Sequence, residues 1–302
     1  MILKIEPKSY RNNIKLRVGG LFEHDDFIIK MQEWFHKNHS CNYVDSVYGG
    51  LSSSLWHSGR LIKNDSISIE KITSILDAYS SVGIDCNFVF SKINISEDDL
   101  KCPISNKLLY VLNYYNRNKN NGVIVTNDLL RDYIKTRYPN LKITCSIIKT
   151  NVVNHPNGDE TVEYYNSLAE SYDRVVMSFH HLIEPDYLKQ LKYKDKMEIL
   201  LTDNCVYDCK YKHMRLTIID KITNNPNNQE YINQLSSFND VCLKNIKPKN
   251  PNIGINDTYI NQLIDCGITN IKLATRKKSK KDFILRISRC VYDVIPSFDG
   301  IE

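Results

Sequence analysis

Short strand-like runs and amphipathic helix patterns alternate along this chain, and that alternation constrains its fold more than any other feature. Eight runs rich in β-branched residues have the character of strands buried on both faces. They are IKLRVGG (14–20), NYVDSVYGG (42–50), IDCNFVF (84–90), GVIVT (122–126), KITCSII (142–148), DRVVMSF (173–179), MEILLT (197–202) and NIKLAT (270–275). Segments with apolar residues at helical spacing accompany them at 25–38, 68–82, 105–118, 127–139, 159–172, 184–194, 256–267 and 279–295.

Eight strands alternating with eight helices predict an α/β fold of the (β/α)8 TIM-barrel type, in one domain spanning residues 1–302. A doubly wound sheet is the alternative, because alternation alone does not reveal whether the sheet closes. Local signals agree with the helix pattern. Asn127 or Asp128 can cap the fourth helix, Pro139 can end it, and Gly267 stands where a glycine commonly follows a helix.

Composition is that of an ordinary globular protein, with 42% hydrophobic residues and a net charge of +5. No apolar run approaches the ~18 residues of a membrane span, and the first residues are too polar for a signal peptide. Nine cysteines, an odd number, suit thiols or metal ligands better than a disulfide framework. We therefore expect a cytoplasmic protein that does not enter a membrane. The mild charge permits an anionic substrate and gives only weak support for nucleic acid.

The connection after the seventh strand, residues 203–255, is much longer than the others and carries a group of possible metal ligands. Cys205 and Cys209 stand four apart, His213 follows at the same interval, and Cys242 comes later. In a barrel, this connection leaves the catalytic rim. Thiolates could hold a 4Fe–4S cluster, or zinc could take the three cysteines with His213. Ordinary thiols are the third reading. A radical SAM pattern is disfavoured, because Lys212 stands where its third cysteine would be.

The loop after the second strand, VYGGLSSSLWHSGR, would lie at the same rim. Gly49 and Gly50 would allow positive φ and a close approach of the backbone to a ligand. Arg60 could bind a carboxylate or phosphate through two parallel hydrogen bonds. The alternative is a simple turn followed by a polar loop.

Three further positions are candidates for the catalytic face. Asn87 is expected to reach the barrel mouth from the third strand and to share a cavity with Arg60. His180 and His181 follow the sixth strand, and one of the two, assigned as His180, could serve as an acid–base group. Lys272 interrupts the last strand, where a buried lysine is costly unless it is paired or used on a ligand.

Several of these stretches together resemble the U-thirty-two peptidase-like (collagenase-like protease) family of (β/α)8 barrels. The matching stretches are VYGGLSSSLWHSGR, GIDCNFVF, GVIVTNDLLRDYIKTRYPNLKITCSI, EILLTDNCVYDCKYKHM and YINQLIDCGITNIKLATRKKS, within residues 15–280. The resemblance implies a 4Fe–4S cluster, with Cys205 and Cys209 matching the family's paired cysteines and Cys242 a further ligand. For the fourth ligand His213, Cys266 and Cys290 are candidates. The longer peptidase signature is only partly present.

Three functions follow from the residues and the resemblance. The first is an iron–sulfur enzyme for redox or oxygen-independent hydroxylation-type modification of a small or RNA-linked substrate, which Arg60, Asn87 and Lys272 would bind. The second is a non-catalytic barrel with a structural zinc or iron–sulfur site, which could partner a related barrel subunit. The third is a metal-free peptidase or hydrolase. The sequence does not name the substrate, because loop chemistry varies within a shared barrel.

Overall fold

The computed structural model describes a barrel core, its surrounding helices and part of the insertion. The residues described are 13–23, 25–39, 44–57, 67–117, 120–150, 160–178, 184–201, 212–225, 227–245, 257–274, 287 and 290. Arg60, His180, His181, Cys205 and Cys209 lie outside them, as does nearly all of the helix expected at 279–295.

Eight parallel strands close into a barrel, with neighbours following the order of the chain. The strands are β1 (Lys15–Gly19), β2 (Val44–Gly49), β3 (Asp85–Phe90), β4 (Gly122–Val125), β5 (Lys142–Cys145), β6 (Arg174–Ser178), β7 (Met197–Leu200) and β8 (Asn270–Leu273). β8 pairs with both β7 and β1, which closes the sheet. The predicted TIM-type barrel is confirmed, and a doubly wound open sheet is excluded.

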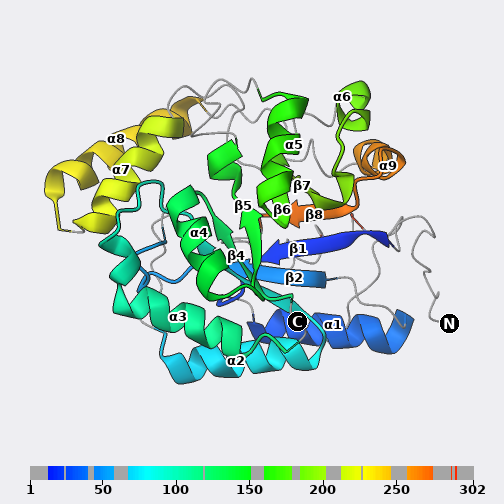
Figure 1. The fold of residues 1–302 in the computed structure, drawn as a ribbon, viewed down its shortest axis with the longest axis horizontal. Helices are drawn as coiled ribbons and strands as arrows, with labels where there is room; N and C mark the ends of the chain where they lie inside the picture. Colours follow the sequence, from blue (N-terminus) through cyan, green and yellow to red (C-terminus); the bar gives the residue numbers. More distant parts are fainter. Residues whose placement is uncertain are drawn as a thin grey trace.

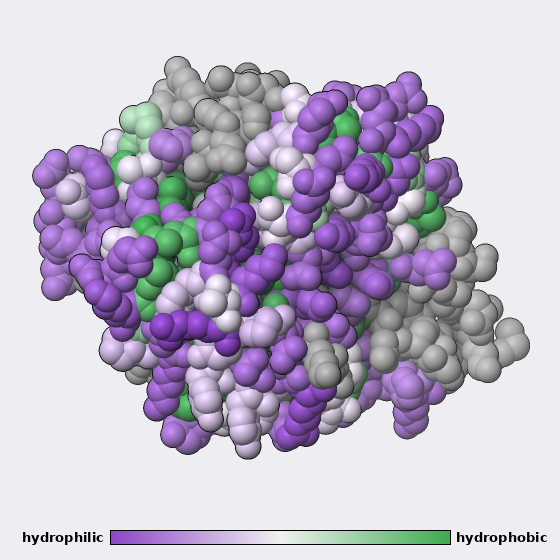
Figure 2. Space-filling view, viewed as in Figure 1, coloured by the Kyte–Doolittle hydropathy of each residue, from purple (hydrophilic) through white to green (hydrophobic). Residues whose placement is uncertain are grey.

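Helices surround the barrel and connect its strands (Figure 1). They are α1 (Asp25–His39), α2 (Ile69–Ser81), α3 (Pro103–Tyr114), α4 (Asp128–Arg137), α5 (Val162–Ser171), α6 (Pro185–Lys189) and α9 (Asp257–Asp265), with short 3-10 turns η2 (Asp99–Lys101) and η5 (Lys194–Lys196). No helix in the described part of the chain has the length and apolar character that a membrane crossing requires. Figure 2 accordingly shows a largely hydrophilic outer surface.

Local sequence signals set several helix boundaries as expected. The Asn127 side chain caps α4 by accepting a hydrogen bond from the backbone of Leu130 at 3.3 Å. α4 then ends at Arg137, two residues before Pro139. Gly267 follows α9 with φ of 83°, a left-handed conformation that glycine adopts without a steric penalty. Two elements are shorter than predicted: β5 ends at Cys145 and leads into a helical turn at 147–150, and α6 ends at Lys189.

The long insertion after β7 contains two helices that the sequence pattern did not indicate, α7 (Lys212–Asn224) and α8 (Gln229–Asn245). They pack through a small apolar cluster that includes Leu216, Ile219 and Leu235. Arg215 near the start of α7 donates to Asn239 near the end of α8 at 3.3 Å, and the Lys221 ammonium lies 5.4 Å from the Tyr231 ring. These contacts show that the two helices run antiparallel.

The barrel separates an apolar shell from an unusually polar interior. The large hydrophobic cluster includes outward strand residues such as Val18, Val47 and Phe88 and the inner faces of the helices. Barrel interiors are ordinarily filled by layers of branched apolar side chains. Here a small cluster that includes Val176 and Leu200 supplies an apolar layer, while charged and hydroxyl side chains occupy much of the rest.

Candidate active site at the carboxyl end of the barrel

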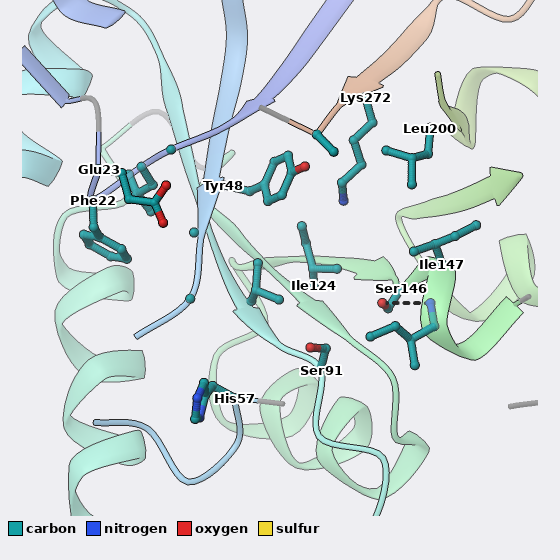
Figure 3. Close-up of a pocket in the computed structure, with 17 residues that line it drawn as sticks. Phe22, Glu23, Tyr48, His57, Ser91, Ile124, Ser146, Ile147, Leu200 and Lys272 are labelled. Carbon is teal, nitrogen blue, oxygen red and sulfur yellow. Dashed lines mark hydrogen bonds between the residues drawn. The ribbon is translucent and has the colours of Figure 1, made fainter. Parts of the chain in front are cut away.

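A cavity of about 70 Å³ lies at the carboxyl ends of the strands, where TIM-barrel enzymes hold their active sites. Residues that follow β1, β2, β3 and β5 form its rim, and side chains of β2, β4, β7 and β8 form its floor (Figure 3). Its walls are mainly apolar, with Ile124, Ile147 and Leu200 among them. A volume of this size holds only a few waters or one small functional group.

Lys272 of β8 brings a positive charge into this cavity. Its side chain is 6% exposed, and its ammonium lies 3.7 Å from Glu198 Oε1 and 4.4 Å from the centre of the Tyr48 ring. The Tyr48 hydroxyl donates to the backbone oxygen of Leu273 at 3.0 Å, which fixes the ring beside the lysine. Figure 3 shows the ammonium reaching past Tyr48 toward the middle of the cavity. The expectation of a buried, paired lysine at this position is confirmed.

Glu198 is the centre of an ionic network that fills the barrel below the cavity. Its side chain is fully buried, and it accepts from Arg174 at 3.1 Å and from Arg17 at 3.4 Å, besides its contact with Lys272. Burial alone would raise the pKa of this carboxyl, but Arg17, Lys272 and Arg174 outweigh burial and hold the pKa below its usual value. Glu198 is therefore ionised at neutral pH.

Arg17 ties this network to the neighbouring strands. Its Nε donates to Ser46 Oγ and its Nη1 to Thr144 Oγ1, both at 3.0 Å. The sequence reasoning missed Arg17, Arg174 and Glu198, although it singled out Lys272 as a charge inside a buried strand. The same signal was present in IKLRVGG and MEILLT, each of which contains one charged residue among buried neighbours.

His57, in the loop after β2, lies at the edge of the same cavity and is buried. Its Nδ1 lies 2.9 Å from the backbone oxygen of Ser54, an atom that can only accept, so Nδ1 carries the proton. Burial lowers the pKa of His57, and the bond to Ser54 offsets part of that effect. A neutral imidazole with Nε2 as an acceptor results.

Two other residues of this loop have structural roles. Trp56 is buried, donates its indole N–H to the backbone oxygen of Asp99 at 2.7 Å and packs edge-on against Phe90. A Cβ at Gly49 would lie 2.9 Å from Leu21 Cβ, so this glycine serves the close approach of the loop after β1. The positive φ expected here is found instead at Gly20, with φ of 103°.

Asn87 does not lie at the carboxyl rim, and its expected position there is wrong. It is the third residue of β3 and lines a different cavity, at the amino ends of the strands. The strand face was predicted correctly, since Asn87 points into the barrel, but the end of the barrel was not. Arg60, its expected neighbour, lies outside the described residues.

The candidate metal ligands are only partly described. His213 is exposed on the first turn of α7, and Cys242 is on α8, without a description of its side chain. Among the described residues, no three His, Cys, Asp or Glu side chains form a metal-binding group. Cys266 just precedes β8, at the amino end of the barrel, with its Sγ 3.9 Å from the backbone oxygen of Pro185. That position is at the opposite end from the Cys205 segment. Cys290 is buried in the apolar core.

Comparisons with known proteins support the fold. No protein-family model matches the chain, and no curated protein matches its sequence. The structure is similar to that of the U32 peptidase Mk0906, with a TM-score of 0.51, 10% identity, and coverage of 86% of this chain and 92% of that one. The resemblance to the U-thirty-two peptidase-like barrels is therefore confirmed at the level of fold.

Two other barrels are more distant. A glycerophosphodiester phosphodiesterase from Parabacteroides distasonis ATCC 8503 has a TM-score of 0.45 and 10% identity, covering 91% of this chain and 98% of that one. Aminoacrylate-bound tryptophan synthase from M. tuberculosis has a TM-score of 0.39 and 10% identity, covering 64% and 76%. At such identities the similarities concern the fold, and they assign no activity to this chain.

Proposed function

We propose that the chain is a U-thirty-two peptidase-like barrel enzyme whose active site is the cavity at the carboxyl end of the barrel. The proposed reaction is a redox or oxygen-independent hydroxylation-type modification of a small or RNA-linked substrate, with an iron–sulfur cluster. The observation that carries the choice of site is the buried ammonium of Lys272 in the wall of that cavity. A charge in a dry, concave, mainly apolar site is typical of ligand-binding centres.

The geometry around Lys272 favours an anionic group on the substrate. A carboxylate or phosphate that entered the cavity would accept a hydrogen bond from the ammonium, which the Tyr48 ring and Glu198 already orient. Apolar walls around the site would strengthen this interaction by excluding water. Neutral His57 at the edge adds an acceptor that could take a proton from the substrate.

The cluster is proposed on the resemblance in sequence, and the α7–α8 pair supports the convergence of its ligands. The contact between Arg215 and Asn239 aligns the end of α8 with the start of α7. Cys242 is three residues beyond Asn239, about one helical turn, so its backbone lies level with the beginning of α7. Cys209 precedes that beginning by three residues. Segments far apart in sequence are thereby brought close enough for thiolates to share a metal.

The donor set fits an iron–sulfur cluster, because Cys205, Cys209 and Cys242 offer the thiolate sulfurs that such clusters require. A bound 4Fe–4S cluster would supply one-electron transfer beside the rim. Zinc is the competing proposal, since the same cysteines with exposed His213 form a tetrahedral set. Cys266 is an unsuitable fourth ligand, because it lies at the other end of the barrel.

Iron and acid-labile sulfide analysis after anaerobic purification tests the cluster. We expect both in the wild type and neither in the Cys205→Ala, Cys209→Ala double variant. Cys102→Ala is the matched control, because this half-buried thiol lies outside the insertion and should leave the metal content unchanged. Stoichiometric zinc that falls in His213→Ala would establish the zinc site instead. Equal metal content in the wild type and the double variant would refute both proposals.

A further inference from the structure

A second cavity opens at the amino-terminal end of the barrel, away from the proposed active site. Its volume is about 220 Å³, and its walls consist of residues at the beginnings of β1, β2, β3, β5 and β6 and just before β4 and β6. In a TIM barrel the interior is normally closed by packed side chains, so a polar cavity at this end is unusual. The proposed function makes no use of it.

Asn87 contributes an unsatisfied hydrogen-bond acceptor to this cavity. The residue is 1% exposed, and its Nδ2 donates to the backbone oxygen of Val47 at 3.4 Å, which fixes the orientation of the amide. Its Oδ1 has no hydrogen-bond partner in the part of the chain that the structure describes. A buried acceptor without a partner is unfavourable, so a ligand that donates a hydrogen bond here would stabilise the site.

The carboxylate of Asp85 faces the same cavity two residues earlier on β3. Unlike Asp173, whose Oδ2 accepts from the backbone of Ile143 at 2.8 Å, it accepts no hydrogen bond from the described residues. Asp45 of β2 lies on the same side, with its Oδ2 3.9 Å from Arg174 Nη1. The β2–β3 side of the cavity therefore offers acceptors that require a positively charged donor.

Cations line the opposite side of this cavity. Lys142 begins β5 and Arg174 begins β6, across the barrel from β2 and β3. Arg174 engages Glu198 and Asp45 through Nη1 alone, so its Nε and Nη2 make no hydrogen bond with the described residues. These groups are suited to an anion at the other end of the same ligand.

The charges of the cavity are balanced as well as separated. Four cationic side chains line it, namely Lys15, Arg17, Lys142 and Arg174. Three carboxylates line it, namely Asp45, Asp85 and Asp173, and Glu198 lies directly beneath as a fourth. A ligand with a net charge would disturb this balance within a partly buried space, whereas a ligand with two opposite charges would not.

We propose that the amino-terminal cavity is a binding site for a small zwitterion of the amino-acid type. Its ammonium group donates to Asn87 Oδ1 and to the carboxylate of Asp85, and its carboxylate group accepts from Arg174. The site uses residues at the beginnings of the strands and is independent of the cysteines and of the carboxyl-end cavity.

The titration of Asp85 gives the site a pH dependence. Burial and the nearby carboxylate of Asp45 raise the pKa of Asp85 to about 6, although Arg17 and Arg174 oppose the rise. Asn87, which is not titratable, is the remaining polar group beside it. Above pH 6 the carboxylate is present for the ammonium group, and below it protonation removes that charge. Binding should therefore weaken as the pH falls through about 6.

Calorimetric titration with four matched probes tests the proposal on the full chain at pH 7.5. The probes are L-alanine, 4-aminobutanoate, ethylamine and propionate, of which the last two each carry one of the charges of alanine. We expect at least one zwitterion to bind and both single-charge probes to bind about tenfold more weakly, the effect of losing one charged hydrogen bond. Absence of binding by both zwitterions, or equal binding by the single-charge probes, would overturn the proposal.

Two variants then locate the binding. Asn87→Ala and Asp85→Asn should each weaken the zwitterion about tenfold. Asp77→Asn, which removes an exposed carboxylate paired with Arg117 outside the cavity, should leave binding unchanged. Unchanged affinity in both cavity variants would refute the site. If Asn87→Ala does not fold, backbone amide shifts of the wild type during titration decide. Shifts at the beginnings of β2 and β3 support the site, and shifts elsewhere alone refute it.

Discussion

The two ends of the barrel differ in the way they use charge. At the carboxyl end, one ammonium, that of Lys272, enters a small and mainly apolar cavity. At the amino end, side chains of both signs line a larger cavity and balance each other. The first end is suited to one anionic group, and the second to a ligand with two opposite charges. Glu198 contacts cations that face both ends, so a single buried carboxylate supports two different electrostatic environments.

The largest effect should come from removing that shared carboxylate. Glu198→Gln keeps the shape but leaves Arg17, Arg174 and Lys272 without their common counter-charge. Breaking a buried ion pair on one side typically costs about 3–5 kcal/mol, and we expect a loss of that size in the free energy of unfolding at pH 7. Urea denaturation measures it. The stabilisation belongs to a carboxyl with a lowered pKa, so it is present above the unfolded pKa and is lost as the pH falls.

An exposed ion pair provides the control for Glu198→Gln. Asp77 lies 2.7 Å from Arg117, and both side chains are more than half exposed. Asp77→Asn should change the free energy of unfolding by no more than about 1 kcal/mol. A loss of this small size in Glu198→Gln as well would show that the ionic network does not hold the two ends together.

Replacement of the lysine should separate the two ends. Lys272→Met retains most of the side-chain volume and removes the charge from the carboxyl-end cavity. Binding of inorganic phosphate or acetate at that end should weaken about 10- to 100-fold, because a charge-assisted hydrogen bond is lost. Calorimetry measures it, with Lys135→Met on the exposed side of α4 as a control. If phosphate and acetate bind equally to Lys272→Met and to the wild type, the carboxyl end is not an anion site.

The smallest effect concerns the amino end and has the opposite sign. The folded-state pKa of Asp85, about 6, is above its ordinary value of 3.8, so the folded protein gains stability as the pH falls from above 6 to below 4. Asp85→Asn should therefore be more stable than the wild type at pH 8, by about 1 kcal/mol after allowance for its partial exposure to solvent. The difference should vanish near pH 4.

Thermal and urea unfolding of Asp85→Asn at both pH values measure this gain. Asp132→Asn, an exposed carboxylate on α4, serves as the reference for a substitution at the protein surface. A variant less stable than the wild type at pH 8 would show that Asp85 is stabilised by its surroundings, and the contrast between the ends would then need another cause.

Sequence patterns predicted much of the fold because local rules govern them. Helical spacing, the Asn127 cap and Gly267 each depend on residues within a few positions, and the structure confirms them. The helices of the insertion were not predicted. The hydrophobic stripe of α7 packs on α8 and not on the barrel, and no strand lies between the two helices to mark their boundaries.

The sequence by itself determined the eight alternating units and the presence of a charge within the last strand. Only the tertiary structure decided that the sheet closes, that Arg17, Glu198 and Lys272 meet inside it, and that Asn87 serves the amino end. The physical reason is that strands of a closed parallel barrel are buried on both faces. Their apolar runs do not show which residues point inward, and the depth of a side chain depends on strand register, which is set by pairing with distant neighbours.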